Sequence, residues 1–302
     1  MRSPGCITNN YFFRRRGGCR QISLFAAGFF LSLFFSLPAG AQRLSILTPE
    51  KTSQNTRFVS KLREALETKF TVIDDGLSEA AYSAVRVEGP FNMTTGTARN
   101  IGAAIGCDYF VMVNTATQRR TSLKQSYYES SAALYVVSSR TGRLVYWGLQ
   151  KFDSEKQAEA EQLLANSAEG LIPDISTRLR EAGAGEMAEK PSRRIEEMPP
   201  ENSPEAKSFR SPVPYKRIKP EYTGVAYLYS IAATVDILLD LDEKGNILRT
   251  EIVRWAGYGL DETVTEAVRK MNWRPAERAG KPLPLRVLLR YNFKKVEKES
   301  EN

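Results

Sequence analysis

The side chains that enzymes most often use for chemistry are scarce in this sequence. The 302 residues include no histidine and three cysteines, Cys6, Cys19 and Cys107. Without histidine, a Ser-His-Asp triad, a Cys-His pair and the usual zinc sites are excluded. Cys107, in the segment IGCDYF between a predicted helix and a predicted strand, fits a small buried side chain better than a nucleophile. We therefore expect a protein that is not an enzyme and that needs no metal or cofactor.

Two pairs of aspartates have a spacing that a metal site or an acid–base pair could use. Asp240 and Asp242 stand as in a calcium loop, but Lys244 occupies a position that needs an oxygen ligand. No glutamate supplies the last ligand, so a solvated hairpin turn is the stronger interpretation. Asp74 and Asp75, which a glycine follows, predict an ordinary turn at a strand end.

The net charge gives little support for a nucleic-acid partner. The formal charge is +8 at pH 7, but residues 1–41 contribute five arginines and no acid, so the remaining chain carries +3. It has no basic stripe interleaved with aromatic residues, which nucleic-acid binding uses. Arg119, Arg120 and Lys124 could bind an anionic partner, although a loop of charges is more often simply solvated.

The first 41 residues have the layout of a secretory signal peptide. Three arginines at positions 14–16 precede an apolar stretch at 22–37, and small residues at Ala39 and Ala41 match the positions that a signal peptidase reads. Cleavage after Ala41 is therefore expected. The alternative is an uncleaved membrane anchor, although this stretch is shorter than the roughly 20 residues that span a bilayer.

Residues 42–183 alternate between helical and strand patterns, which predicts an α/β domain. We expect strands at 43–49, 70–75 and 109–116, helices at 55–69 and 95–105, a long hairpin at 126–152, and a helical stretch at 155–180 that breaks near 170–173. Gly102 and Gly106 are expected to let a helix lie close to its sheet. The following residues, 184–213, are rich in Pro, Glu, Lys and Ser and predict a disordered linker.

Residues 214–295 predict a small α+β domain of the order strand, strand, helix, strand. Apolar residues alternate from Val235 to Leu241, and a second strand follows the turn EKGN at 247–255. A helix is expected at 260–271 with Asp261 as its N-cap, and a third strand at 285–293. Trp255 and Trp273 are expected to be core or half-buried, and residues 296–302 form a charged tail.

This C-terminal pattern resembles the C-terminal domain of TonB-family proteins. The matching elements occur in the family's order at Pro220 and Tyr222, Val235 to Leu241, Gly245, Gly257 with Leu260 and Asp261, Trp273 to Ala276, Gly280 to Pro282, and Phe293. The resemblance implies that the strand after the helix pairs with a short segment of an outer-membrane receptor. Carried to this sequence, it implies a partner-binding site at Arg286, Leu288, Arg290 and Asn292, with Ser211, Pro212, Val213, Pro214 and Tyr215 beside the bound peptide.

The preceding domain resembles the N-terminal domain of TolB and related CsgG-type envelope proteins. The elements that carry this second resemblance are Val72 to Asp75, Ile105 to Phe110 and Val136 to Leu144. They are turns and strand starts, so they imply an architecture rather than an activity.

The TonB-type resemblance implies a periplasmic protein that binds TonB-dependent outer-membrane receptors and supports energised nutrient uptake. The alternative is a soluble cell-envelope adaptor or scaffold that transmits no force. In the family, an uncleaved N-terminal helix couples to an inner-membrane proton-driven motor through a polar residue, whereas this apolar stretch offers only Ser23, Ser32 and Ser36. Motor coupling is thus expected only if the N-terminus stays uncleaved. A homodimer formed through the last strand is a further alternative.

Overall fold

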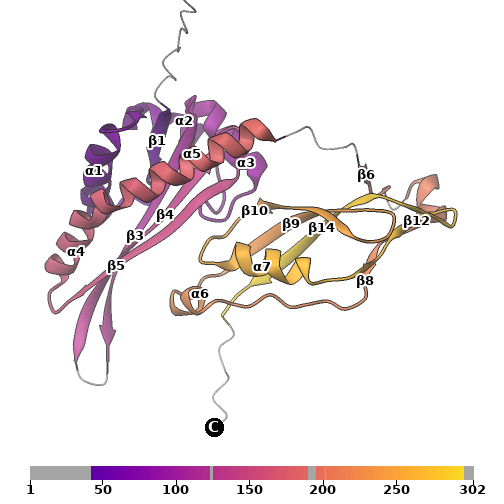
Figure 1. The fold of residues 1–302 in the computed structure, drawn as a ribbon. Coiled ribbons are helices and arrows are strands. Elements are labelled where there is room, and N and C mark those ends of the chain that lie inside the picture. Colours follow the sequence, from indigo (N-terminus) through magenta and orange to yellow (C-terminus); the bar gives the residue numbers. More distant parts are fainter. Residues whose placement is uncertain (1–41, 123–124, 190–194, 201, 296–302) are drawn as a thin grey trace, which may run out of the picture. The chain divides into compact units, whose positions relative to one another are not determined.

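The computed structural model describes residues 42–122, 125–189, 195–200 and 202–295. The predicted signal peptide, Lys124 and the predicted charged tail lie outside these residues. The described chain mixes helices with parallel and antiparallel strands, which confirms the predicted α+β class (Figure 1). Among the described residues, no helix is both long enough and apolar enough to cross a membrane.

The first part of the chain is built on a five-stranded sheet in the order β2-β1-β3-β4-β5 (Figure 1). β1 pairs in parallel with β2 and β3, whereas β3, β4 and β5 form an antiparallel meander. The strands are β1 (Arg43–Leu47), β2 (Thr71–Val72), β3 (Tyr109–Thr121), β4 (Ser126–Ser138) and β5 (Leu144–Ser154).

Both faces of the central strands β3 and β4 are largely buried, and successive residues of these strands point alternately into two cores. On β4, Leu134 and Val136 face a core shared with three helices, α1 (Ser53–Glu67), α4 (Gln157–Asn166) and α5 (Ile172–Ala188). Tyr135 and Val137 face the other core, which takes in α2 (Asp75–Val85) and α3 (Thr95–Ile105). Gly102 on α3 allows this packing, because a Cβ there would lie 2.3 Å from the Cβ of Ser139.

The helices of this part follow the sequence prediction with one exception. Helix α3 has the predicted bounds, and the expected helix break is the 3-10 turn η1 (Ser167–Leu171) between α4 and α5. The turn predicted at Asp74 and Asp75 is wrong, because α2 begins there. The carboxylate of Asp74 accepts a hydrogen bond from the backbone N–H of Leu77 at 3.1 Å, so Asp74 caps a helix.

Within the segment predicted as a linker, the structure has short elements that pair with the C-terminal part. Helix α5 continues to Ala188, past the predicted domain boundary. Four elements follow, β6 (Glu196–Glu197), the 3-10 turn η2 (Pro204–Ser208), β7 (Phe209–Arg210) and β8 (Val213–Pro214). β6 pairs with β14 (Leu285–Phe293), β7 with β12 (Ala276–Arg278) and β8 with β11 (Trp273–Arg274).

A second sheet, in the order β10-β9-β14-β6, forms the C-terminal part (Figure 1). Its main elements have the predicted order: β9 (Ala233–Leu241), β10 (Ile247–Arg254), α7 (Leu260–Arg269) and β14 (Leu285–Phe293). The short helix α6 (Gly224–Leu228) and the strands β11 (Trp273–Arg274), β12 (Ala276–Arg278) and β13 (Lys281–Leu283) complete it.

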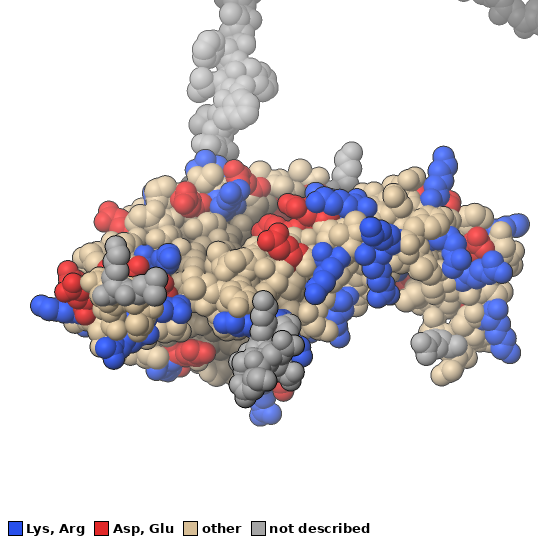
Figure 2. All heavy atoms as spheres, turned by 90° about the horizontal axis from the view of Figure 1, so that it is seen from below, with Lys and Arg blue, Asp and Glu red and all other residues tan. Residues whose placement is uncertain are grey.

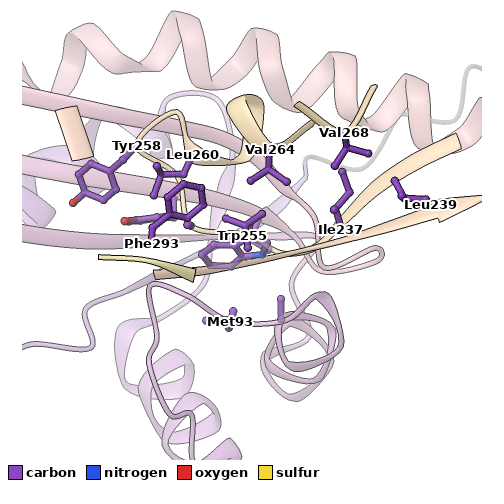
Figure 3. Close-up of a cluster of buried hydrophobic side chains, with 14 of the residues drawn as sticks. Met93, Ile237, Leu239, Trp255, Tyr258, Leu260, Val264, Val268 and Phe293 are labelled. Atoms are coloured by element: carbon purple, nitrogen blue, oxygen red, sulfur yellow. The ribbon is translucent and has the colours of Figure 1, made fainter. Parts of the chain in front are cut away.

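Helix α7 packs its apolar side on β9. Figure 3 shows Val264 and Val268 above Ile237 and Leu239, and all four are buried. The predicted N-cap is wrong, because Gly259, with φ of 75°, occupies that position. The carboxylate of Asp261 turns back to the preceding loop instead. There it accepts the N–H of Ala256 at 2.9 Å and that of Gly257 at 2.9 Å.

The first part and the C-terminal part share one hydrophobic core. Tyr135 and Trp147 of the five-stranded sheet pack on Trp255 and Tyr258, which follow β10; we call these four aromatic residues the junction. The ring centroids of Tyr135 and Trp255 lie 5.7 Å apart, and those of Trp147 and Tyr258 lie 4.6 Å apart. Trp255 is buried together with Met93 from the loop before α3 (Figure 3).

Hydrogen bonds fix the geometry of the junction. The indole Nε1 of Trp255 donates to the carbonyl of Gly142 at 3.2 Å. Asn92 holds the start of β9 and the end of β10 together: its amide donates to the carbonyls of Thr234 and Trp255 at 2.8 and 2.7 Å, and its oxygen accepts the N–H of Thr234 at 2.9 Å. Gly257 has a φ of 71°, and a Cβ there would lie 2.4 Å from Trp147, so this close approach requires glycine.

Candidate functional site

Strand β14 carries the candidate site because it lies near the edge of its sheet. It pairs with β9 along its whole length, from Leu285 opposite Leu241 to Phe293 opposite Ala233. On its other side, β6 pairs with Leu285 and Arg286 alone. In the described part of the chain, no further strand pairs with that side of β14. An edge strand presents unpaired N–H and C=O groups, which an extended peptide can use.

The face of the sheet opposite α7 carries a row of ion pairs. Arg286 reaches both oxygens of Asp240, at 2.7 and 2.9 Å, and Arg290 reaches both oxygens of Asp236 at the same distances. Arg254 of β10 reaches Asp236 from the other side at 3.2 Å. Bidentate arginine–carboxylate pairs of this kind are geometrically specific, so they fix the directions of the two arginine side chains on β14.

Both carboxylates of this row are buried, with Asp236 3% and Asp240 4% exposed. Hydrogen bonds from Arg290, and then from Arg254, hold the pKa of Asp236 below its usual range against the opposing effect of burial. The hydrogen bond to Asp240 raises the pKa of Arg286. The prediction that Asp240 belongs to a solvated turn is therefore wrong. Asp242 does shape that turn, since its carboxylate accepts the N–H groups of Lys244 and Asn246.

The two other predicted residues on β14 share this face. Leu288 is 50% exposed and stands opposite Leu238 of β9. Asn292 is exposed, and its amide oxygen accepts the hydroxyl of Thr234 at 2.8 Å. The structure thus brings Arg286, Leu288, Arg290 and Asn292 into one row, with an apolar position between the two arginines.

The predicted segment Ser211 to Tyr215 does not pair with β14. Its central residues form β8, which pairs with β11, and the N–H of Tyr215 donates to the carbonyl of Asn272 at 2.9 Å. Ser211 has its hydroxyl 3.7 Å from the sulfur of Met198, which follows β6. This segment therefore pairs with β11 and contacts the chain after β6.

The sequence prediction of the site missed Asp236 and Asp240. Their spacing of four residues in a strand places both on one face, and Arg286 and Arg290 have the same spacing on β14. That matching pattern was the available signal. The register that sets each arginine against its aspartate is a tertiary feature, and no local pattern shows it.

The remaining candidates take structural roles. Arg120 lies in β3, where it pairs with the buried Glu129 at 2.8 Å, so it is not a solvated loop charge. Tyr229 donates to the same carboxylate at 3.3 Å, and burial raises the pKa of Tyr229 to about 12. Cys107 is buried as predicted, with its sulfur 3.3 Å from the hydroxyl of Ser139, and burial raises the pKa of its thiol. Among the described residues, no cluster of three or more potential metal ligands occurs.

Comparisons with known proteins identify a family for one part of the chain. Residues 218–294, which are less than half of the chain, match the family model described as the Gram-negative bacterial TonB protein C-terminal. A comparison with curated proteins found no match.

Solved structures share only low similarity with the chain. The TonB C-terminal domain of Pseudomonas aeruginosa is 17% identical, with a TM-score of 0.27, and the match covers 35% of this chain and all of that one. Lipoprotein GNA1162 of Neisseria meningitidis is 12% identical, with a TM-score of 0.32, and the match covers 45% of this chain and 99% of that one.

The LpoB C-terminal domain of Salmonella enterica is 17% identical, with a TM-score of 0.25, over 39% of this chain and 87% of that one. Scores this low carry no argument about function. The family model is the stronger finding, because it covers β9, β10, α7 and β14. Residues 218–294 of this chain are therefore similar to the TonB C-terminal family.

Proposed function

We propose that this chain is an exported, periplasmic protein that binds TonB-dependent outer-membrane receptors and supports energised nutrient uptake. The binding step is strand addition, in which an extended receptor segment pairs with the outer edge of β14. A pull through that added strand loosens the receptor, and no covalent bond is made or broken. One observation carries the proposal: β14 is nine residues long, and β6 covers only its first two.

The side chains on β14 explain how such an edge would select a peptide. Residues of an added strand lie beside their neighbours on the same face, within about 4.5 to 5.5 Å between Cβ atoms. Arg286 and Arg290 would meet acidic side chains, and Leu288 would meet an apolar one. The guanidinium groups are already held by buried aspartates, so binding would order few additional rotamers.

Binding can be tested with synthetic peptides that copy the N-terminal segments of TonB-dependent receptors from the same bacterium. We expect Leu288→Glu to weaken binding about tenfold, the effect of losing about 1.4 kcal/mol of contact. Leu248→Glu is the matched control, because Leu248 is 60% exposed on β10, the strand at the other edge of the same sheet. Equal affinity of both variants for the peptides would contradict a site on β14.

A soluble envelope adaptor without force transduction is the second candidate, and the junction favours it. Trp255 and Tyr258 are buried against Tyr135 and Trp147, so the TonB-type part is packed on a second folded part instead of ending a free spacer. The intact mass of the protein from separated envelope fractions distinguishes the two. A chain that starts at Gln42 in the soluble periplasm supports the adaptor. A full-length chain in the inner membrane supports transduction and a proton-driven motor partner.

The β14 edge would also allow two copies of the chain to pair. Light scattering of the purified protein with and without receptor peptide tests this alternative. A dimer that the peptide converts to monomers would place self-pairing on the same edge.

A further inference from the structure

A segment of the same chain, β6, already pairs with the first residues of the β14 edge. β6 pairs in parallel with β14, with Glu196 opposite Leu285 and Glu197 opposite Arg286. Both glutamates are exposed, and they come from a segment whose composition predicts no strand of its own. The pairing is therefore imposed by the edge of β14 and not by the local sequence.

Ionic contacts hold this segment in place. The carboxylate of Glu196 lies 2.7 Å from the guanidinium of Arg278 on β12. The pKa of Arg286 is raised mainly by its hydrogen bond with Asp240. The negative charge of Glu197, which stands opposite Arg286, raises it further. Residues 209–295 contain sixteen Lys and Arg against ten Asp and Glu. Lys and Arg side chains predominate in the right half of Figure 2, which holds the C-terminal sheets.

The chain is also fixed on both sides of β6. Before it, Glu189 at the end of α5 bridges two arginines, Arg143 at 2.8 Å and Arg249 at 2.5 Å. After it, β7 pairs with β12 at Phe209 and Arg210. A segment tethered at both ends has a high effective concentration at its site, so a small contact can compete with a free peptide.

We propose that residues 195–198 act as a strap, an internal competitor that occupies the start of the β14 edge and that an incoming extended, acidic peptide must displace. The inference rests on the proposed function, because it concerns access to the same edge. The strap covers only two positions of β14 and is held by an exposed ion pair, so it is displaceable by a partner that pairs along the whole strand. Release of the strap uncovers Arg278 and the first part of β14 for that partner.

The strap can be tested without a receptor. The probe is a fluorescent synthetic peptide that copies residues 195–200, IEEMPP, titrated into the full chain. In Glu196→Lys, the new cation repels Arg278 and opens the strap. We expect this variant to bind the probe about tenfold more tightly than the wild type. This is the effect expected when the fraction of molecules with an open strap rises from about a tenth to nearly all. Glu181→Lys is the matched control, because it makes the same charge change and breaks an exposed ion pair with Arg178 on α5; it should bind as the wild type does.

Hydrogen exchange provides the second readout. The amides at the start of β14, Leu285 to Val287, should exchange faster in Glu196→Lys than in Glu181→Lys, while those of β9 stay unchanged. Equal affinity of the three proteins for the probe, including no measurable binding to any, would overturn the strap. Unchanged exchange at the start of β14 in Glu196→Lys would also overturn it.

The affinity for receptor peptides distinguishes failure of the strap from failure of the proposed receptor role. Probe binding that increases in Glu196→Lys while no receptor peptide binds would retain the strap and reject the receptor role. Receptor peptides that bind the wild type and Glu196→Lys with equal affinity would reject the strap and retain the role.

Discussion

At the junction, Trp255 and Tyr258 insert among aromatic side chains of the five-stranded sheet, and an indole N–H is hydrogen-bonded to a backbone carbonyl 113 residues away. At the β14 edge, by contrast, two exposed glutamates pair with two residues of the strand. Both are contacts between the C-terminal sheet and earlier parts of the chain. One removes large apolar surfaces from water, and the other is mostly polar and solvated.

The difference separates a permanent contact from an exchangeable one. Buried aromatic packing with matched hydrogen bonds is lost only when the surrounding structure opens. A two-residue pairing on an exposed edge can be exchanged while the sheet remains intact. The molecule thus keeps the TonB-type part fixed at one end and leaves its last strand available at the other.

The largest expected effect on stability comes from removing the indole of Trp255 from the junction. Trp255→Ala removes a side chain that is 1% exposed and leaves a cavity beside Tyr135 and Met93. We expect a loss of about 3 to 5 kcal/mol in the free energy of unfolding, measured by chemical denaturation. Trp147→Phe, which keeps an aromatic ring at the junction, is the milder comparison. A loss below about 1 kcal/mol for Trp255→Ala would show that the two parts do not depend on each other.

The next effect concerns the loop that positions Trp255. Asp261→Ala leaves the N–H groups of Ala256 and Gly257 without their acceptor, at an expected cost of about 1 to 3 kcal/mol in the free energy of unfolding. Asp261→Asn keeps one acceptor oxygen and should cost less. Thermal melting of the two variants at pH 5 measures the difference, and equal melting temperatures would contradict this role of the Asp261 side chain.

Two buried aspartates should respond to pH in opposite directions. Burial raises the pKa of Asp261 to about 7, so its contribution to stability is full below the unfolded pKa, about 3.9, and is lost as pH rises through 7. The pKa of Asp236 is lowered, so its contribution is present above about 3.9 and is lost as pH falls below that value. Denaturation of Asp261→Asn and Asp236→Asn from pH 3 to 8 should remove the alkaline and the acid dependence respectively. The same pH profile in both variants would contradict the assignment.

The smallest effect on stability is expected at the strap. Glu196→Lys breaks an exposed ion pair and should lower the free energy of unfolding by about 1.4 kcal/mol at most, which is the equivalent of a tenfold change in strap opening. The same variant should change peptide access about tenfold. A melting temperature as strongly lowered as in Trp255→Ala would show that β6 is part of the core and not an exchangeable segment.

Local patterns predicted most of the regular elements. The alternation from Val235 to Leu241 and the helical period of α3 were sufficient to predict these two elements. Each has one face toward a core, so its apolar residues recur with the period of a strand or a helix. Asp74 was ambiguous, since an aspartate before a glycine suits both a turn and a helix N-cap. The short strand β6 has no such pattern, because its pairing depends on β14.

The site could be predicted only in part. Arg286, Leu288, Arg290 and Asn292 lie in one row because strand alternation places them there. Their pairing with Asp236 and Asp240 depends on the register between β9 and β14. The contact of Trp255 with Gly142 depends on how two distant segments pack. Neither this strand register nor this packing can be predicted from a local stretch of sequence.

The most direct test of this account is hydrogen exchange of the full chain with a TonB-dependent receptor peptide that binds it. We predict slower exchange in Leu285 to Phe293, faster exchange in Glu196 and Glu197 as the strap leaves, and no change around Trp255 and Tyr258. Protection at another strand with β14 unchanged would contradict strand addition at this edge. Faster exchange at the junction on binding would contradict its role as the permanent contact.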